Sequence, residues 1–447
     1  MTAAAPRVRV VVLNYDGGEM TMRCLRALEQ VDWPRDSLEI VLVDNASIDG
    51  ITRTIERELP DVRVIEHTHN VGFAGGCNLG FEDLDGVDYV ALLNNDAIPE
   101  REWLRPLVDA LDADPGLGAA SSKMVFAPSF AALTIVADVP NSAELGVQIT
   151  GLTLDGEEVW DHAQFADGCH RTETRGTGAE QVCWTAARAE VRVPVDPGSD
   201  PTGKVIGIEL SAEGDTNVRL SAGAETVVVT VGQDPVWFEV PVVGPSFDVI
   251  NNVGSRLVLG GYGGDRGFCE RDEGQYEAPS EVFAWCGGAV LLSIAYLRDV
   301  GLFDDRYFVY YEDTDLAWRG QLAGWRYLYV PASVVRHEHS ATATEASPLR
   351  MHFVERNRFA TLARNAPWSM LGDATYVYLR DTAVIAKREI VEPIVHRSRP
   401  NSALTFRRLR AFGGFVEMLP ATLASRRRQH VDARARAALV EEWAVPQ

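Results

Sequence analysis

The sequence lacks several features that would place a chain in a particular compartment. None of its six cysteines stands in a C-x-x-C pair. No apolar run reaches the length of a membrane span. The N-terminal stretch M-T-A-A-A-P-R-V-R-V-V-V contains no signal-peptide h-region. We therefore expect a cytoplasmic protein with reduced cysteines.

Positive charge is scarce over most of the chain. The 42 Lys and Arg residues face 64 Asp and Glu, and the net charge of −22 argues against nucleic acid as a partner. Residues 380–447 are the exception, because they hold 13 basic and 7 acidic residues. This tail is therefore +6 and the remainder −28. It predicts either an Arg-rich helical cap or a peripheral contact with anionic lipid at the inner face of the cell membrane.

Apolar runs near the N-terminus predict the strands of a parallel sheet. They cover residues 8–13, 38–43, 62–65 and 89–93, and the first helical pattern lies between the first two of them. Strands that alternate with helices indicate βαβ units and an α/β fold. With 447 residues, the chain is long enough for two or three domains.

Three of these runs end at a polar residue, namely Asn14, Asp44 and Asn94. Because the carboxyl ends of parallel strands meet at one edge of a sheet, we expect these side chains to converge there. Asn95 and Asp96 follow Asn94, and a carboxylate at this edge suits a hard divalent cation that neutralises a diphosphate. Each residue alone is equally typical of a turn or a helix cap.

A second group of acidic residues comprises Glu312, Asp313 and Asp315. Three carboxylates within four positions repel one another, so a fold keeps them together only with partners or for a function. If Asp313 opens a helix, its charge also meets the positive end of the helix dipole. Further along, His337 or His339 is a candidate metal ligand, although a single surface histidine usually binds nothing.

Residues 128–244 differ in character from both flanks. Short alternating segments separated by turns predict a β-sandwich of about 110 residues. The segment holds 18 acidic and 6 basic residues. Its Trp160, Trp184 and Trp237 are either core aromatics or a platform for stacking sugars.

The order and spacing of several motifs resemble the family 2 glycosyltransferases, which have the GT-A fold. The motifs are V-V-L-N-Y, V-D-N-A-S-I-D-G, N-V-G-F-A-G-G-C-N, L-L-N-N-D and Y-Y-E-D-T-D-L-A-W-R, followed by R-H. The nearest branch looks like the bacterial rhamnosyltransferase-type enzymes of cell-envelope and related glycans. The resemblance covers about residues 8–127 and 245–368. It implies a GT-A domain with a mostly parallel, Rossmann-like sheet and helices.

The resemblance also implies roles for individual residues. Asp96 would be the carboxylate ligand of Mn²⁺ or Mg²⁺ and His337 a further ligand, while Asp313 would be the catalytic base beside Glu312. Asn94 departs from the family's D-x-D motif, because the first acid is missing. The residues expected to line the nucleotide, sugar and acceptor sites are Asn14, Tyr15, Asp44, Asn45, Asn70, Gly72, Asn94, Asn95, Trp285, Gly287 and Gly288.

Four segments follow from this reading. Residues 1–127 would form the nucleotide-sugar-binding half and 245–370 the acceptor and catalytic half. Residues 128–244 would be an inserted β-sandwich, and 371–447 a helical basic extension. In the loop that holds Asn70, the neighbouring glycines would let the backbone approach a ligand closely.

The implied activity is an inverting, metal-assisted transfer of a sugar from a nucleotide-diphosphate donor of the dTDP-rhamnose or UDP-sugar type. The acceptor would be a hydroxyl of a glycan, a lipid-linked glycan or a natural product. A nucleotidyltransferase is an alternative, but residues 13–19 contain no Lys or Arg for a triphosphate. A non-catalytic glycan-binding protein is another, and the intact Glu312-Asp313 pair speaks against it.

Overall fold

The computed structural model describes residues 5–139, 145–170, 173–175, 180–338 and 347–446. His339, the alternative metal ligand, lies outside the described residues. The chain forms two compact units. The first comprises Met1–Val125, Ile250–Glu270 and Gly274–Gln447, and the second comprises Phe126–Val249 and Arg271–Glu273.

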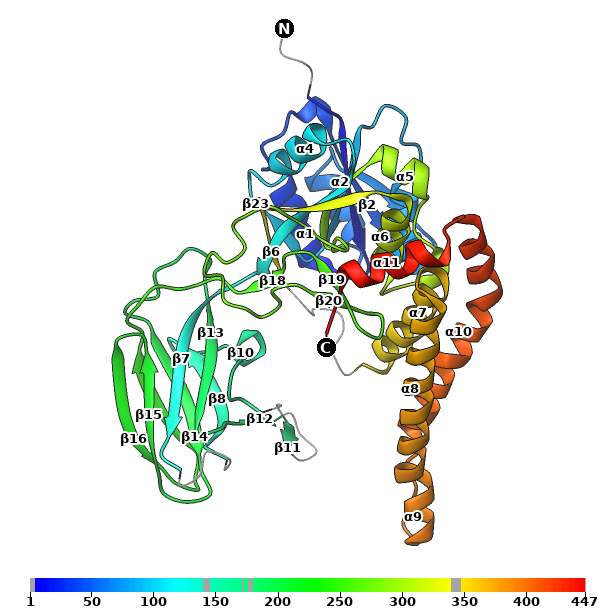
Figure 1. Ribbon diagram of the computed structural model, residues 1–447. Coiled ribbons are helices and arrows are strands. Elements are labelled where there is room, and N and C mark those ends of the chain that lie inside the picture. Colours follow the sequence, from blue (N-terminus) through cyan, green and yellow to red (C-terminus); the bar gives the residue numbers. More distant parts are fainter. Residues whose placement is uncertain (1–4, 140–144, 171–172, 176–179, 339–346, 447) are drawn as a thin grey trace. The chain divides into compact units, whose positions relative to one another are not determined.

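The first unit is built around a ten-stranded sheet with the strand order β21-β23-β6-β22-β4-β1-β2-β3 (Figure 1). Two further strands join this sheet off the main path, where β18 pairs with β6 and β5 with β23. The strands are β1 (Val8–Asn14), β2 (Leu38–Asp44), β3 (Arg63–Glu66), β4 (Tyr89–Asn94), β5 (Ala97–Pro99), β6 (Leu117–Phe126), β18 (Ile250–Asn252), β21 (Ser280–Glu281), β22 (Ala289–Ser293) and β23 (Arg326–His337).

The predicted α/β class is confirmed, but the sheet is mixed rather than mostly parallel. Strands β1 to β4 are parallel to their neighbours in the set β3-β2-β1-β4. Strand β22 returns antiparallel to both β4 and β6. Residues 289–292 form a short apolar segment whose sequence does not indicate the direction of the strand. The sequence pattern therefore did not predict that β22 runs antiparallel to its neighbours.

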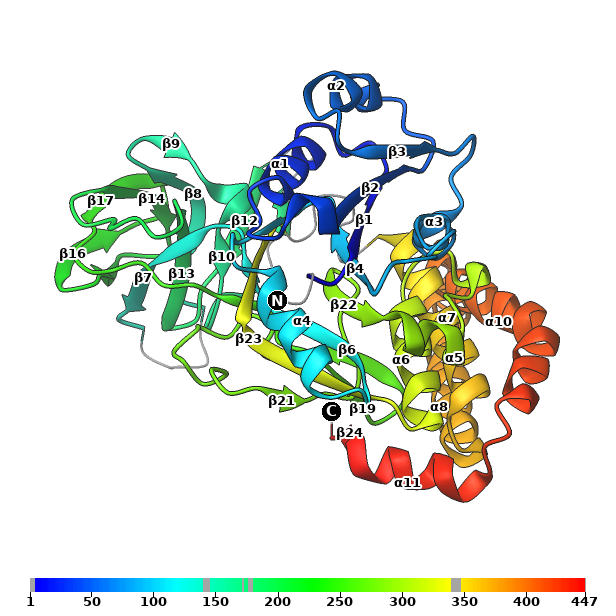
Figure 2. The same cartoon turned by 90° about the horizontal axis from the view of Figure 1, so that it is seen from above.

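Helices cover both faces of the sheet, as Figure 2 shows from above. Val10 and Val12 of β1 share a core with α1 (Gly18–Leu28), α2 (Ile51–Glu58) and α4 (Leu104–Ala113). Val11 of the same strand belongs to the opposite core, with α3 (Gly72–Gly80), α5 (Ile294–Val300) and α6 (Glu312–Ala323). This alternation explains why the strand reads as a continuous apolar run.

The glycines of α3 bring that helix close to the sheet. A Cβ atom on Gly76 would lie 2.3 Å from the Leu13 side chain, and one on Gly80 would lie 2.4 Å from Val11. Gly72 has φ +78° and would place a Cβ 2.3 Å from the carbonyl oxygen of Phe308. These glycines therefore serve helix–sheet packing and a tight turn, and the close approach of the loop backbone to a ligand stays a prediction.

The second unit consists of two antiparallel sheets around one aliphatic core. Its all-β character is as predicted. One sheet runs β10 (Gln164–Phe165), β13 (Arg188–Val195), β7 (Ser129–Ala137), β15 (Thr216–Ala222) and β16 (Glu225–Val231). The other runs β11 (Glu173–Arg175), β12 (Glu180–Trp184), β8 (Gln148–Leu154), β14 (Val205–Ser211) and β17 (Val236–Pro241), with β9 (Glu157–Glu158) beside β8.

Two of the tryptophans considered for a sugar platform differ in their surroundings. The ring of Trp160 packs 4.6 Å from that of Phe165. Trp237 is 46% exposed and lies over Gly151 and Gly207, where added Cβ atoms would approach its ring to 2.7 and 3.5 Å.

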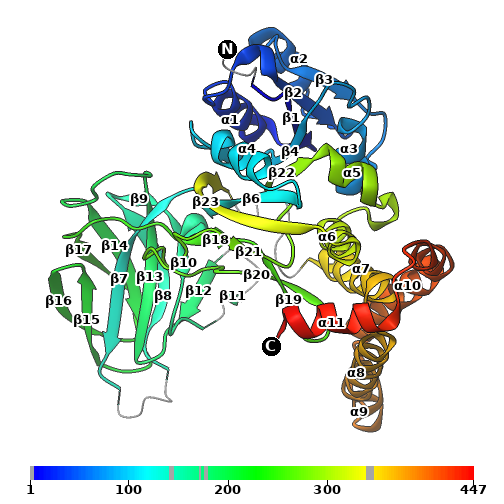
Figure 3. The ribbon, with the colours of Figure 1, turned by 45° about the horizontal axis from the view of Figure 1, so that its top comes forward.

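The C-terminal part of the first unit is helical (Figure 3). It comprises α7 (Pro348–Asn365), α8 (Trp368–Ala386), a π-helical stretch (Lys387–Val391), α9 (Glu392–Val395), α10 (Ala403–Arg428) and α11 (Ala433–Trp443). Phe359 of α7 packs against Tyr378, Phe412 and Phe415 of α8 and α10. Strand β24 (Ala444–Val445) then pairs with β19 (Ser255–Val258), which also pairs with β20 (Tyr262–Asp265).

Two arginines of the basic tail are structural. Arg426 donates to the carbonyls of Ala363 and Ala366, at 3.1 and 2.7 Å. Arg436 is 1% exposed and donates to the carbonyls of Arg364 and Asn365. Both cations thus cap the C-terminal end of α7, where the helix dipole is negative. This part of the tail is the helical cap that the sequence offered as one of two readings.

Candidate active site

The polar residues at the strand ends converge as predicted. Asn14 pairs in register with Asp44, and its neighbour Leu13 pairs with Asn94. Asn14 Nδ2 donates to Asp44 Oδ1 at 2.8 Å, and its Oδ1 accepts from the hydroxyl of Thr21 at 2.7 Å. Asn95 Nδ2 donates to the same hydroxyl oxygen at 3.0 Å. The side chains therefore form one connected network across the carboxyl ends of β2, β1 and β4.

Within this network, Asn14 is a supporting residue. It is fully buried, and both ends of its amide are taken up inside the chain. In this structure its amide contacts and orients Asp44, while the predicted contact of Asn14 with a base or ribose stays a prediction. Tyr15, the next residue, is 47% exposed and accessible to a ligand.

Ser47 is a further member of this network, and one that the sequence analysis did not single out. Its hydroxyl accepts from Asn14 Nδ2 at 2.9 Å and from the backbone N–H of Asp16 at 3.0 Å. Its own backbone N–H donates to Asp44 Oδ2 at 3.1 Å. The signal was present in the sequence, because Ser47 lies three residues after Asp44 in a polar loop.

Asn45 joins this network to the glycine-rich loop. Its Nδ2 donates to Asn70 Oδ1 and to the carbonyl of Gly72, and its Oδ1 accepts from the N–H of Val71. Asn45 is 1% exposed, so its amide fixes the loop and is not presented to a ligand. Asn70 is only partly buried, and it also accepts from the N–H of Gly72 at 2.8 Å.

Asp96 and His337 lie side by side because two strands pair. Residue His337 ends β23 opposite Ala97, the first residue of β5. Its Nε2 atom lies 3.0 Å from Asp96 Oδ1. On the other side of the ring, Nδ1 lies 3.1 Å from Asn251 Oδ1, which can only accept. Both neighbouring oxygens can only accept, so the imidazole can donate to Asn251 from Nδ1 or face Asp96 with a proton on Nε2.

These two residues fit a divalent cation. Asp96 Oδ1 is buried and accepts no hydrogen bond from the described residues, although Nε2 is close. A carboxylate oxygen and an imidazole nitrogen that face one another are ligands that a cation could join, with the ring proton then on Nδ1 toward Asn251. No cluster of three or more His, Cys, Asp or Glu suited to a metal occurs in the described part of the chain. The remaining ligands would come from a bound diphosphate and water.

Asn94 lies next to this pair, in the place of the missing acid. Its Nδ2 is 3.3 Å from His337 Nε2, and its backbone N–H donates to the carbonyl of Gly288 at 3.0 Å. A neutral amide at this position leaves the pair with one carboxylate, so the protein supplies less negative charge to a cation than two acids would.

The second acidic cluster opens α6, as the sequence predicted, and its three carboxylates have different surroundings. Asp313 accepts from the N–H of Gly287 at 3.2 Å and from the N–H of Thr314 at 2.6 Å. Burial raises the pKa of Asp313, while these N–H donors act against the shift. Asp313 is therefore a poorly solvated carboxylate held by backbone donors.

Glu312 and Asp315 are both buried but serve differently. Burial raises the pKa of Glu312 well above its usual range, and the charge of Asp313 adds to the shift. Oε2 of Glu312 has no hydrogen-bond partner among the described residues. Asp315, in contrast, accepts from Arg319, Arg364 and Asn365 at 2.6 to 2.9 Å. The side chain of Asp315 is thus engaged in structural hydrogen bonds, whereas Glu312 and Asp313 are the candidates for a catalytic role.

The dipeptide Gly287-Gly288 connects the two halves of the site. The N–H of Gly287 donates to Asp313, and the carbonyl of Gly288 accepts from the N–H of Asn94. A Cβ on Gly288 would lie 2.9 Å from the terminal methyl of Met124, which would have to shift to admit a larger residue. The turn before β22 therefore fixes Asp313 next to the Asn94-Asn95-Asp96 segment.

Trp285 does not line the site. It is fully buried, and its ring packs 6.2 Å from that of Phe303. Its side chain therefore lies in the core in this structure, and the role of the Trp285–Ala289 segment in shaping the sugar pocket stays a prediction.

Asp265 is a site residue that sequence reasoning missed. It ends β20, accepts from Asn252 Nδ2 at 2.6 Å, and its charge acts on both Asp313 and His337. Asp265 is solvent-exposed, and desolvation by the surrounding protein nevertheless raises the pKa of its carboxyl. The sequence carried a weak signal, since Asp265 follows a run of glycines that appeared irregular.

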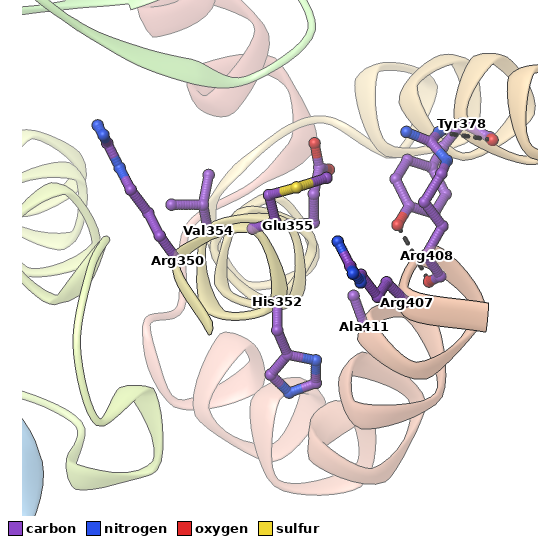
Figure 4. A pocket seen from close by; sticks show the side chains of 9 residues that line it. Arg350, His352, Val354, Glu355, Tyr378, Arg407, Arg408 and Ala411 are labelled. Carbon is purple, nitrogen blue, oxygen red and sulfur yellow. Dashed lines mark hydrogen bonds between the residues drawn. The ribbon is translucent and has the colours of Figure 1, made fainter. Parts of the chain in front are cut away.

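A separate cavity of about 160 Å³ lies between α7, α8 and α10 (Figure 4). Arg408 stacks over the ring of Tyr378 there and donates to its carbonyl at 3.0 Å. The lining residues are Arg350, Met351, His352, Val354, Glu355, Tyr378, Arg407, Arg408 and Ala411. No predicted site residue is among them, so the network at the sheet edge remains the candidate active site.

Comparison with known proteins agrees with this geometry. Residues 9–129 match the model of the family described as glycosyl transferase family 2. The chain carries a family 2 glycosyltransferase domain. This domain includes the strand-end network and Asp96, while the segment with Asp313 and His337 lies beyond the matched residues.

Two relatives match part of this chain. The glycosyltransferase AglE of Haloferax volcanii is 29% identical over 107 residues, which cover 23% of this chain and 35% of AglE. The N-acetylglucosaminyl-diphospho-decaprenol L-rhamnosyltransferase of Mycobacterium tuberculosis is 40% identical over 95 residues, 20% of this chain and 30% of that protein. The chain thus spans about a third of the length of these relatives.

Among solved structures, that of GalNAc-T7 with UDP, GalNAc and Mn²⁺ aligns with 95% of this chain and 58% of its own. The sequence identity is 13% and the TM-score 0.46.

Proposed function

We propose that this chain is an inverting glycosyltransferase that moves a sugar from a nucleotide-diphosphate sugar to a hydroxyl group. The observation that carries the proposal is the Gly287-Gly288 link, which fixes the carboxylate of Asp313 beside the segment of Asp96. A base and a diphosphate-binding edge are the two parts that such a displacement requires.

In this proposal Asp313 accepts the proton of the acceptor hydroxyl as the new glycosidic bond forms on the face opposite the departing diphosphate. Its raised pKa suits a base that takes up a proton late in the reaction. Glu312, whose pKa burial raises well above its usual range, would lie beside Asp313 and shape the sugar and acceptor pocket. Asp96 and His337 would hold Mn²⁺ or Mg²⁺, and the cation would supply charge neutralisation to the leaving diphosphate.

We further propose that the donor is of the dTDP-rhamnose or UDP-sugar type. The acceptor is then a glycan, lipid-linked or natural-product hydroxyl. Support comes from the L-rhamnosyltransferase whose polyprenyl-diphosphate substrate its name states, together with the resemblance of the motifs. The nucleoside would contact Asp44 and the exposed Tyr15.

The test is a panel of nucleotide sugars, each measured for thermal stabilisation and for hydrolysis in Mn²⁺. We expect one donor class to stabilise the protein and to be hydrolysed slowly, and Asp313→Asn to retain the stabilisation but not the hydrolysis. If no nucleotide sugar or nucleoside diphosphate stabilises the wild-type protein, the proposal fails.

A further inference from the structure

Exposed apolar side chains are concentrated on the C-terminal helices. Among the described residues, 21 large apolar side chains are exposed, and 11 of these stand within residues 368–416. The other ten are scattered from Tyr15 to Leu349. Scattered apolar residues on a surface are ordinary, whereas a dense group usually marks a contact surface.

The far end of these helices is the least covered part. We call residues 384–409 the tip; it comprises the end of α8, the π-helical stretch, α9, the following loop and the start of α10. No residue of Lys387–Val391 or Glu392–Val395 is buried. In Figures 1 and 3, α9 lies at the end of α8 that points away from the sheet of the same unit. The exposed apolar residues of the tip are Val384, Val391, Ile394, Val395, Phe406 and Leu409.

The tip is also positively charged. It holds six Lys and Arg against two Glu, a net charge of +4, while the whole chain is −22. Both acids have partners, because Glu389 accepts from the N–H and hydroxyl of Thr405, and Glu392 lies 4.0 Å from Lys387. The exposed cations are Lys387, Arg388, Arg397, Arg399 and Arg407.

We propose that the tip docks on the surface of an anionic lipid bilayer. Aliphatic side chains flanked by Lys and Arg are typical of segments that lie at the boundary between headgroups and acyl chains. The cations are complementary to anionic headgroups, whereas the acidic remainder of the chain is repelled by them. A protein partner would favour aromatic anchors, yet only one of the six exposed apolar residues of the tip is aromatic.

This contact requires no membrane-spanning segment. Among the described residues, no helix is long and apolar enough to cross a bilayer. The apolar residues reach only the interface, so binding depends on both hydrophobic burial and electrostatic attraction. The inference goes beyond the transferase activity and does not depend on it.

The experiment is flotation of the full chain with vesicles of phosphatidylcholine alone, or with about 30% phosphatidylglycerol. We expect binding only to the anionic vesicles, and weaker binding at high salt. The triple variant Arg388→Gln, Arg397→Gln, Arg399→Gln should lower the partition coefficient about 100-fold, since each cation contributes about fivefold. The variant Ile394→Ser, Val395→Ser should also bind more weakly, but without losing the salt dependence.

Two matched variants serve as controls. Val228→Ser removes a valine that is 68% exposed, against 69% for Val395, and Arg53→Gln removes an exposed arginine far from the tip in sequence. Both should bind vesicles as the wild type does. The proposal is overturned if the wild type does not float with anionic vesicles at low salt, or if the controls lose as much binding as the tip variants. It is also overturned if the tip variants instead abolish a dimer seen by light scattering, because the tip would then bind a second copy of the chain.

Discussion

The imidazole Nε2 of His337 lies 3.0 Å from the carboxylate of Asp96, and no described group donates a hydrogen bond to that oxygen. The two residues are 241 positions apart and meet because the last residue of β23 pairs with the first residue of β5. This juxtaposition is the basis of the proposed cation site.

Replacing Asp96 by Ala should weaken the binding of a nucleoside diphosphate in Mn²⁺ and leave the weaker binding in EDTA nearly unchanged. The reason is that the carboxylate acts on the diphosphate through the cation. Isothermal titration in the two buffers measures the difference. His337→Ala should show the same pattern more mildly. An equal loss in both buffers would mean that Asp96 is structural.

Asp313→Asn should reduce turnover by about 100-fold or more, because a neutral amide cannot take the acceptor proton. The amide oxygen still accepts from the N–H of Gly287, so the fold and the donor affinity should be kept. Single-turnover transfer and donor titration separate the two effects. Turnover close to that of the wild type would remove Asp313 from the role of base.

The pH dependence of stability should reveal Glu312. Its pKa is raised well above 4.5 in the folded protein, so folding binds a proton at this site. The contribution to stability is present below the unfolded-state pKa and is lost as the pH rises toward the folded-state pKa. Relative to Glu312→Gln, the wild type should therefore lose up to about 1.4 kcal/mol of unfolding free energy per pH unit above pH ~4.5.

Urea unfolding of both proteins from pH 4 to pH 8 measures this difference, at about one-unit steps. Glu239→Gln, which removes an exposed glutamate, should give a curve parallel to that of the wild type. A parallel curve for Glu312→Gln as well would show that Glu312 is ionised in the folded protein.

The buried arginine Arg364 should be essential for stability. It is 2% exposed and bridges Asp304 and Asp315. Arg364→Met removes the cation shared by both carboxylates, while Asp315 keeps Arg319 and Asn365 and Asp304 keeps Arg306, so the loss should cost about 3 kcal/mol. Arg380→Met breaks the exposed pair with Asp381 and should leave the free energy of unfolding nearly unchanged. Denaturation midpoints compare them, and equal costs would contradict the network.

The sequence was informative wherever local pattern and strand polarity suffice. Parallel strands predicted that Asn14, Asp44 and Asn94 would meet, and the register places them together. The sequence was uninformative for features that depend on pairing between segments far apart in the chain. The antiparallel return of β22 and the position of Asp265 depend on contacts that local periodicity does not contain. Burial also changed roles, because Asn14 and Trp285 looked like ligand contacts but are enclosed by neighbours that are remote in sequence.

The last prediction concerns removal of the second unit, Phe126–Val249 with Arg271–Glu273. Val125 of β6 pairs directly with Ile250 of β18, so the two ends of the insertion already lie side by side in the first unit. A short Gly-Ser linker that replaces residues 126–249 therefore closes the gap without moving either strand.

We expect this deletion variant to fold and to bind nucleotide sugars as the full chain does, because every predicted site residue belongs to the first unit. Transfer to the natural acceptor should be the activity that changes, since the acidic sandwich suits a neutral glycan or a protein better than an anionic acceptor. Donor affinity and hydrolysis are measured beside transfer, and circular dichroism verifies the fold. The control is the full chain with the same linker inserted after Gly198, in an exposed turn of the sandwich, which should retain all activities. If a well-folded deletion variant loses donor binding, the sandwich contributes to the donor site. The proposal that the first unit binds the donor without the second is then wrong.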